Sequence, residues 1–171
     1  KIVYGYEPTD SLNPWRVYSP DAPTWVNDLT ALEPGHGYWL YATESVTLYL
    51  DYEPPLPRVA VQSQTTLPDP PAAFYGYVSA SPEAAETAGV PITARIGNVV
   101  CAQTKSRIIQ QRAVFTLKVP ADDRGAAGCG QLGDIVTFDV GSRRRQTTWD
   151  NRRVQLVAAD LRQVFLAIVR R

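Results

Sequence analysis

Proline most limits how this chain can fold, because 14 prolines divide its 171 residues into short segments. Five of them fall within the first 34 residues. Proline lacks a backbone N–H and its ring clashes with the preceding helical turn, so no long helix is expected there. The segments between them are the β-type runs 1–6, 15–20, 38–43 and 46–50. The first third is therefore predicted to be β structure, with one or two helical turns at most in residues 22–32.

Six further prolines mark residues 54–71 as a semi-rigid linker with polyproline character. The linker divides the sequence into a first β module, residues 1–53, and a larger body, residues 72–160. An apolar segment, residues 161–171, follows the body. No apolar run approaches the roughly 18 residues that a membrane helix needs, so no membrane span is predicted.

Alternation of apolar and polar residues dominates the body. Val136, Phe138 and Val140 fall on one side of a strand, and residues 113–119 alternate in the same way. A period of two with one apolar face is typical of an antiparallel sheet that packs on a partner sheet. Seven such runs favour an immunoglobulin-like β sandwich, and they cover residues 72–80, 90–97, 99–104, 113–120, 134–140, 146–150 and 153–158. The whole chain is thus predicted to be all-β, with two modules.

Charge is distributed unevenly along the chain although the net charge is zero. Residues 1–55 hold 2 basic and 8 acidic residues, a net −6, and the remainder holds 15 basic and 9 acidic residues, a net +6. The two parts are expected to attract each other, either within one molecule or between neighbours. The alternative is that solvated faces simply differ, because surface charges vary at little structural cost.

His36 is the only histidine, and it lies between two glycines in the sequence PGHG. Glycine supplies the positive φ that turns require, so His36 is predicted to occupy the corner of a turn. It has no neighbouring cysteine or histidine to share a metal, and no nucleophile in a recognisable motif. Asp122, Asp123 and Asp134 lack the spacing of a calcium loop. No catalytic residue, cofactor or metal is predicted, and the chain is not expected to be an enzyme.

Cys101 and Cys129 are the only cysteines, and they lack the spacing of a zinc site. In an exported chain they would form one disulfide, whereas in a cytosolic protein they would remain two buried thiols.

Aromatic side chains crowd the first module and are the best candidates for ligand contact. Trp15, Trp25, Tyr38 and Trp39 could stack on a glycan, or they could form the core of a small module that has few aliphatic residues. Five arginines in residues 142–153 would suit an anionic polymer, or they could lie on a solvated hairpin. No nucleic-acid partner is predicted.

Residues 13–48, NPWRVYSPDAPTWVNDLTALEPGHGYWLYATESVTL, resemble a module repeated in secreted bacterial surface proteins, especially from Chloroflexi-type organisms. The shared pattern is a Trp, Tyr-x-Pro, Asn-Asp-Leu-Thr and Pro-Gly-x-Gly-Tyr-Trp. In that family the module opens with an upstream strand, so the resemblance implies that the first strand is missing here or is supplied from elsewhere. The chain has no methionine, and position 1 is expected to fall inside a longer protein.

The body carries a second resemblance. Residues 74–101, FYGYVSASPEAAETAGVPITARIGNVVC, are similar to the opening of prealbumin-like, carboxypeptidase-regulatory-type domains. Residues 128–141 and the TTW of residues 147–149 resemble an extracellular bacterial variant with one Cys after the second strand and one in a glycine-rich loop. This resemblance implies a Cys101–Cys129 bridge and an extracellular location, and it brings no active site.

The C-terminal segment DLRQVFLAIVRR has the composition of a β-strand with charged flanks. It is predicted to lie on its own body, on the first module or on a neighbouring molecule. In the last case the chain would be an extracellular structural or assembly protein, joined head to tail with copies of itself or with other surface proteins by strand donation. A carbohydrate-binding or adhesion module is the alternative. The predicted assembly strand is Val164, Phe165, Leu166, Ala167, Ile168 and Val169.

Overall fold

The computed structural model describes residues 1–33, 35–47, 68–78, 88–122 and 126–157. Within these ranges the chain is all-β, as predicted, and the one helical element is the 3-10 turn η1 (Thr24–Val26). This turn lies in residues 22–32, where the sequence allowed it. None of the described helices is long and apolar enough to cross a membrane.

The first module forms an antiparallel sheet of three strands, in the order β2-β1-β3. Its strands are β1 (Ile2–Tyr6), β2 (Trp15–Tyr18) and β3 (Gly37–Tyr41). The predicted runs 1–6, 15–20 and 38–43 are confirmed. The predicted run 46–50 is not confirmed, because Val46 and Thr47 lie outside any strand and the rest falls outside the described residues.

The body is a sandwich of two four-stranded sheets, in the orders β10-β9-β5-β6 and β11-β4-β8-β7. Its strands are β4 (Ala72–Tyr77), β5 (Pro91–Ile96), β6 (Val99–Lys105), β7 (Arg107–Ile109), β8 (Arg112–Val119), β9 (Ile135–Val140), β10 (Arg143–Thr148) and β11 (Gln155–Val157). The alternation in residues 113–119 and 135–140 correctly identified the inner faces of β8 and β9. Phe74 of β4 and Phe138 of β9 meet in the core between the sheets, with ring centroids 5.0 Å apart.

Two features of the sandwich differ from the prediction. Strand β7 was missed because it has only three residues and is followed by Gln110 and Gln111, both at positive φ, so it shows no alternation. Strand β11 pairs with β4 in parallel, although the sandwich was predicted to be antiparallel. The chain leaves β10 in one sheet and crosses to the other sheet before β11 begins. Strand β11, the last of the body, therefore runs beside β4, the first of the body, in the same direction.

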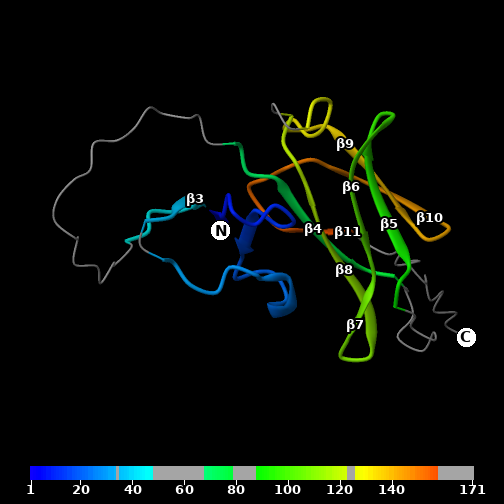
Figure 1. Ribbon diagram of the computed structural model, residues 1–171, viewed down its shortest axis with the longest axis horizontal. Coiled ribbons are helices and arrows are strands. Elements are labelled where there is room, and N and C mark those ends of the chain that lie inside the picture. Colours follow the sequence, from blue (N-terminus) through cyan, green and yellow to red (C-terminus); the bar gives the residue numbers. More distant parts are fainter. Residues whose placement is uncertain (34, 48–67, 79–87, 123–125, 158–171) are drawn as a thin grey trace, which may run out of the picture.

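The three-stranded sheet packs on the outer face of β4 and β8. Its buried residues Ile2, Tyr4 and Val17 form one apolar cluster with Ala73 of β4. Trp25 of η1 reaches the same strand, where its ring lies 5.7 Å from that of Tyr75. The structure therefore has three layers of sheet, and the middle sheet is β11-β4-β8-β7 (Figure 1).

Candidate functional site

The face of the three-stranded sheet that points away from the body is the best candidate for a functional surface. Side chains alternate along a strand, so Val3 and Gly5 lie on the face opposite to the buried Ile2 and Tyr4. Residues 27–33 cross this outer face, and a methyl group at Gly5 would lie only 3.1 Å from Leu29 Cδ1. The crossing segment borders two hollows, one polar and one apolar.

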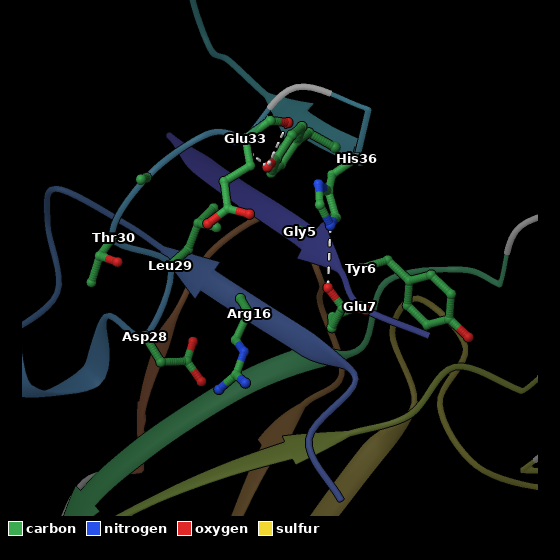
Figure 2. A pocket seen from close by; sticks show the side chains of 11 residues that line it. Gly5, Tyr6, Glu7, Arg16, Asp28, Leu29, Thr30, Glu33 and His36 are labelled. Carbon is green, nitrogen blue, oxygen red and sulfur yellow. Dashed lines mark hydrogen bonds and ion pairs between the residues drawn. The ribbon is translucent and has the colours of Figure 1, made fainter. Parts of the chain in front are cut away.

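The polar hollow has a volume of about 320 Å³ and brings together side chains from β1, β2 and the turn before β3 (Figure 2). Its acidic and basic residues are Glu7, Arg16, Asp28, Glu33 and His36. The sequence predicted a role only for His36 among them. The other four residues are scattered over the first 33 positions and have no known catalytic spacing, so they were not predicted as site residues.

His36 occupies the turn that precedes β3, as predicted, and Gly35 beside it has a φ of 85°. Its Nε2 lies 3.2 Å from Oε2 of Glu7 on the adjacent loop (Figure 2). Both side chains are about one-third exposed, at 37% and 34%. The contact therefore ties the β3 turn to the end of β1 at the protein surface.

Hydrogen bonds from Thr9, through its hydroxyl and its backbone N–H, lower the pKa of Glu7, and His36 contributes to the same shift. Glu7 thus accepts local hydrogen bonds, an arrangement that favours its ionised form. A general acid would need a raised pKa instead. The hollow therefore suits electrostatic recognition better than proton transfer.

We expect Glu7→Gln to weaken the acid dependence of stability. Because the folded-state pKa lies below the unfolded value, the folded state holds the proton less tightly than the unfolded chain. The stability that Glu7 contributes is complete above its ordinary pKa of 4.5 and is lost as the pH falls through the folded-state pKa. Thermal melts between pH 2 and 7 test this, with Glu44→Gln as the exposed control. Equal acid dependence in both variants would contradict it.

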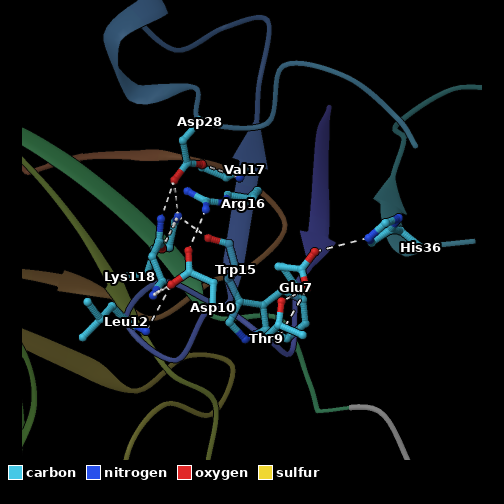
Figure 3. Close-up of polar contacts among 11 residues, drawn as sticks. Glu7, Thr9, Asp10, Leu12, Trp15, Arg16, Val17, Asp28, His36 and Lys118 are labelled. Atoms are coloured by element: carbon cyan, nitrogen blue, oxygen red, sulfur yellow. Dashed lines mark hydrogen bonds and ion pairs between the residues drawn. The ribbon is translucent and has the colours of Figure 1, made fainter. Parts of the chain in front are cut away.

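Lys118 of β8 joins the body to the base of the polar hollow (Figure 3). Its Nζ donates to Asp28 Oδ2 at 2.6 Å, to Asn13 Oδ1 at 3.0 Å and to the carbonyl of Trp15. Burial lowers the pKa of Lys118, and the Asp28 carboxylate partly offsets that shift. This ion pair joins the acidic first module to the basic body, so at least one of the attractions predicted from the charge split lies within a single molecule.

We expect Lys118→Met to destabilise the attachment of the first module by about 2 kcal/mol, since it leaves three acceptors without their charged donor. Urea titration followed by tryptophan fluorescence measures the loss, because Trp15, Trp25 and Trp39 all lie in that module. Lys105→Met on the exposed part of β6 is the matched control.

If Asp28→Asn is added to Lys118→Met, the further loss should be smaller than the loss from Asp28→Asn alone. Additive losses would show that the two side chains do not stabilise the attachment as a pair.

The apolar hollow is a groove of about 630 Å³ on the same outer face. It is lined by Val3, Tyr18, Leu29 and Leu32, together with smaller residues of the crossing segment. Val3 lies opposite Tyr18 on one side and Leu40 on the other, so the three residues form a row across the sheet. Tyr18 and Leu40, on either side of Val3, are 44% and 58% exposed, so both ends of this row present large side chains to solvent.

The predicted contact aromatics are placed mainly in packing roles. Trp15 and Trp39 lie against each other, with ring centroids 4.9 Å apart, and both border the apolar cluster below the sheet. Trp25 packs against Tyr75 and so attaches the module to β4. The hydroxyl of Tyr38 accepts from the backbone N–H of Glu33 and donates to its carbonyl. A role of these aromatics in glycan binding stays a prediction.

Cys101 and Cys129 form the predicted disulfide, with their Cα atoms 5.6 Å apart. The nearby Asp122 carboxylate accepts hydrogen bonds from the Gly128 N–H and the Gln131 side chain, which lower its pKa. This aspartate therefore holds the segment on both sides of Cys129 against residue 122. Asp123 falls outside the described residues. Among the residues that are described, no group of three or more His, Cys, Asp or Glu side chains could hold a metal ion.

The arginines of residues 142–153 largely have partners within the molecule. Arg144 pairs with Asp139 at 2.9 Å, Arg153 pairs with Asp150 at 3.3 Å, and the guanidinium of Arg152 lies 5.9 Å from the ring centroid of Tyr41. These contacts favour the solvated hairpin over a surface reserved for an anionic polymer. The predicted assembly strand, residues 164–169, lies outside the described residues.

Comparison with protein-family models, with curated proteins and with solved structures finds no match for this chain. The two resemblances drawn from the sequence therefore stay predictions.

Proposed function

We propose that this chain is an extracellular structural protein whose three-stranded sheet joins it to other β modules. The observation that carries the proposal is the exposed apolar row Tyr18, Val3 and Leu40, with its adjoining groove. Contiguous apolar surface of this kind marks sites of protein interaction, because contact with another protein removes it from water. Lys118 holds the sheet that carries this row on the body through its bonds to Asp28, Asn13 and Trp15. These bonds give the surface a rigid base.

The Cys101–Cys129 disulfide supports the extracellular location, because disulfides persist in oxidising environments. The sequence resemblance to secreted surface proteins points the same way.

Self-assembly is the form of joining that we favour. Residues 164–169 would act as a donated strand, added to the sheet of the next molecule by β-augmentation. The donor and acceptor would be different surfaces, so the contact would repeat head to tail without closing and would produce a filament or a surface layer.

The test is to compare the full chain with a variant that lacks residues 161–171. Negative-stain electron microscopy and sedimentation velocity at matched concentrations should show filaments or large oligomers for the full chain and monomers for the deletion variant. Filaments that persist without residues 161–171 would reject strand donation. A full chain that stays monomeric at millimolar concentration would reject self-assembly.

A carbohydrate-binding or adhesion module is the second candidate, and the polar hollow favours it. This hollow is lined by carboxylates, by the Arg16 guanidinium, which pairs with Asp10 at 2.6 Å, and by the phenols of Tyr6 and Tyr38, in a volume suited to one or two sugar rings. Polysaccharide pull-down combined with tryptophan fluorescence tests this function. A saturable signal that Arg16→Ala abolishes would support it, whereas binding unaffected by Arg16→Ala would place any glycan elsewhere.

A further inference from the structure

We infer that the outer edge of β3, Gly37–Tyr41, is the acceptor for the donated strand. The inference rests on the proposed function and names the surface at which assembly occurs. Strand donation requires an edge whose backbone N–H and C=O groups are free to form a new ladder. The edges of the three sheets differ sharply in this respect.

The β2 edge of the first module is already occupied. Asp28 Oδ1 accepts from the backbone N–H of Val17 at 2.6 Å, and Asn27 Oδ1 accepts from that of Ser19 at 2.9 Å. The carbonyl of Val17 accepts from the N–H groups of Asp28 and Leu29, and that of Ser19 accepts from the Asn27 side chain. These backbone and side-chain groups of residues 27–29 take the place of a neighbouring strand, so a donated strand would have to displace them.

The β3 edge lacks such protection within the described part of the chain. There β3 pairs with β1 alone, which leaves its other side as the margin of the sheet. Residues 37–43, GYWLYAT, contain no charged residue and no proline, which are the usual means of blocking an edge. Leu40 and Tyr41 are 58% and 42% exposed. An uncharged and apolar edge strand is the surface that an added strand would cover most favourably.

The body offers weaker acceptors. Strands β7 and β11 have three residues each, too few for a ladder with a six-residue donor. Strand β10 begins with three consecutive arginines, which would repel the arginines that flank the donor. The first half of β6 carries the disulfide to Cys129, and the strand ends at Lys105.

Charge supports the pairing of β3 with the C-terminal segment. Arg162 precedes residues 164–169, and Arg170 and Arg171 follow them. Glu33 and Glu44 flank β3, and Glu7 lies beside the turn that leads into it. These three glutamates outnumber Arg152, whose guanidinium lies 5.9 Å from the Tyr41 ring. Opposite charges around the acceptor and the donor segment therefore steer their encounter and discourage pairing with the arginine-rich β10 edge.

Cysteine cross-linking between full-length copies tests the acceptor directly, because both native cysteines are already paired in a disulfide. One copy carries Ala167→Cys in the donor and the other carries Leu40→Cys in β3. The matched control replaces Leu40→Cys with Tyr18→Cys on the β2 edge, which has similar exposure. Mild oxidation of each mixture, followed by non-reducing electrophoresis, should give at least tenfold more heterodimer with Leu40→Cys.

The outcomes separate this inference from the proposed function. One outcome is that filaments form and that Ala167→Cys cross-links to Tyr18→Cys at least as efficiently as to Leu40→Cys. This outcome would overturn the β3 acceptor and leave strand donation intact. Filaments that do not depend on residues 161–171 would overturn both. As a second measurement, Leu40→Lys should lower the oligomer fraction at least tenfold, whereas Leu132→Lys, on an exposed loop of the body, should leave it unchanged. Equal assembly by the two lysine variants would also overturn the inference.

Discussion

Gly130→Ala is expected to destabilise the sandwich by about 3 kcal/mol or more. A Cβ at this position would lie 1.8 Å from Nε1 of Trp149, far inside van der Waals contact. The indole is a rigid ring, 3% exposed, and its Nε1 donates to the carbonyl of Val119 at 3.0 Å. The new methyl group would push the ring out of its site and break the hydrogen bond from the indole to the Val119 carbonyl. Urea denaturation followed by near-ultraviolet circular dichroism measures the loss.

A double-mutant cycle identifies the cause. In a Trp149→Leu background the ring is absent, so Gly130→Ala should cost at least 1 kcal/mol less than in the native chain. An equal cost in both backgrounds would show that contact with Trp149 does not set the cost.

The strands of the sandwich were predictable because their signal is local. In β8 and β9 the apolar residues recur at every second position, and that period alone identifies the inner face. Strand β7 lacked this signal, since three residues are too few to show a period. The parallel pairing of β11 with β4 could not be predicted either, because it depends on how the chain crosses between sheets and not on residues near β11.

The candidate site was less predictable because its contacts join distant residues. Lys118 lies in the alternating run 113–119, yet its partner Asp28 lies 90 positions away. No pattern around either residue indicates that pair. The protection of β2 was also hidden, although Asn and Asp side chains often replace backbone partners in this way. The sequence Asn27-Asp28 therefore contains a usable signal for this protection.

His36 shows the opposite case. Its flanking glycines predicted a turn correctly, and Gly35 has the positive φ that this turn requires. Its contact with Glu7 could not be foreseen, because the loop after β1 approaches the β3 turn only when the sheet is formed. The residues next to His36 thus determine its local conformation, whereas they do not indicate its electrostatic partner.

Loss of the Cys101–Cys129 disulfide is the second large effect that we expect. The bridge closes a loop with a sequence separation of 28 residues, and its removal frees the unfolded chain from that constraint. Chain-entropy arguments put the cost at about 3 to 4 kcal/mol for a loop of this length. We expect Cys101→Ala combined with Cys129→Ala to lower the free energy of unfolding by that amount, because alanine adds no polar group at the buried Cys129.

The position of the bridge determines which part of the fold should loosen first. Cys129 immediately precedes Gly130, whose backbone N–H and C=O bond to Pro120 and Asp122 and whose Cα faces Trp149. Without the bridge, the loop loses its covalent tie to β6, so hydrogen exchange should accelerate at Gly130 before it does at β4 or β8. A reducing agent should reproduce the loss in the native chain and leave the double variant unchanged. Equal urea midpoints for the oxidised native chain and the double variant would show that this loop is held by its hydrogen bonds alone.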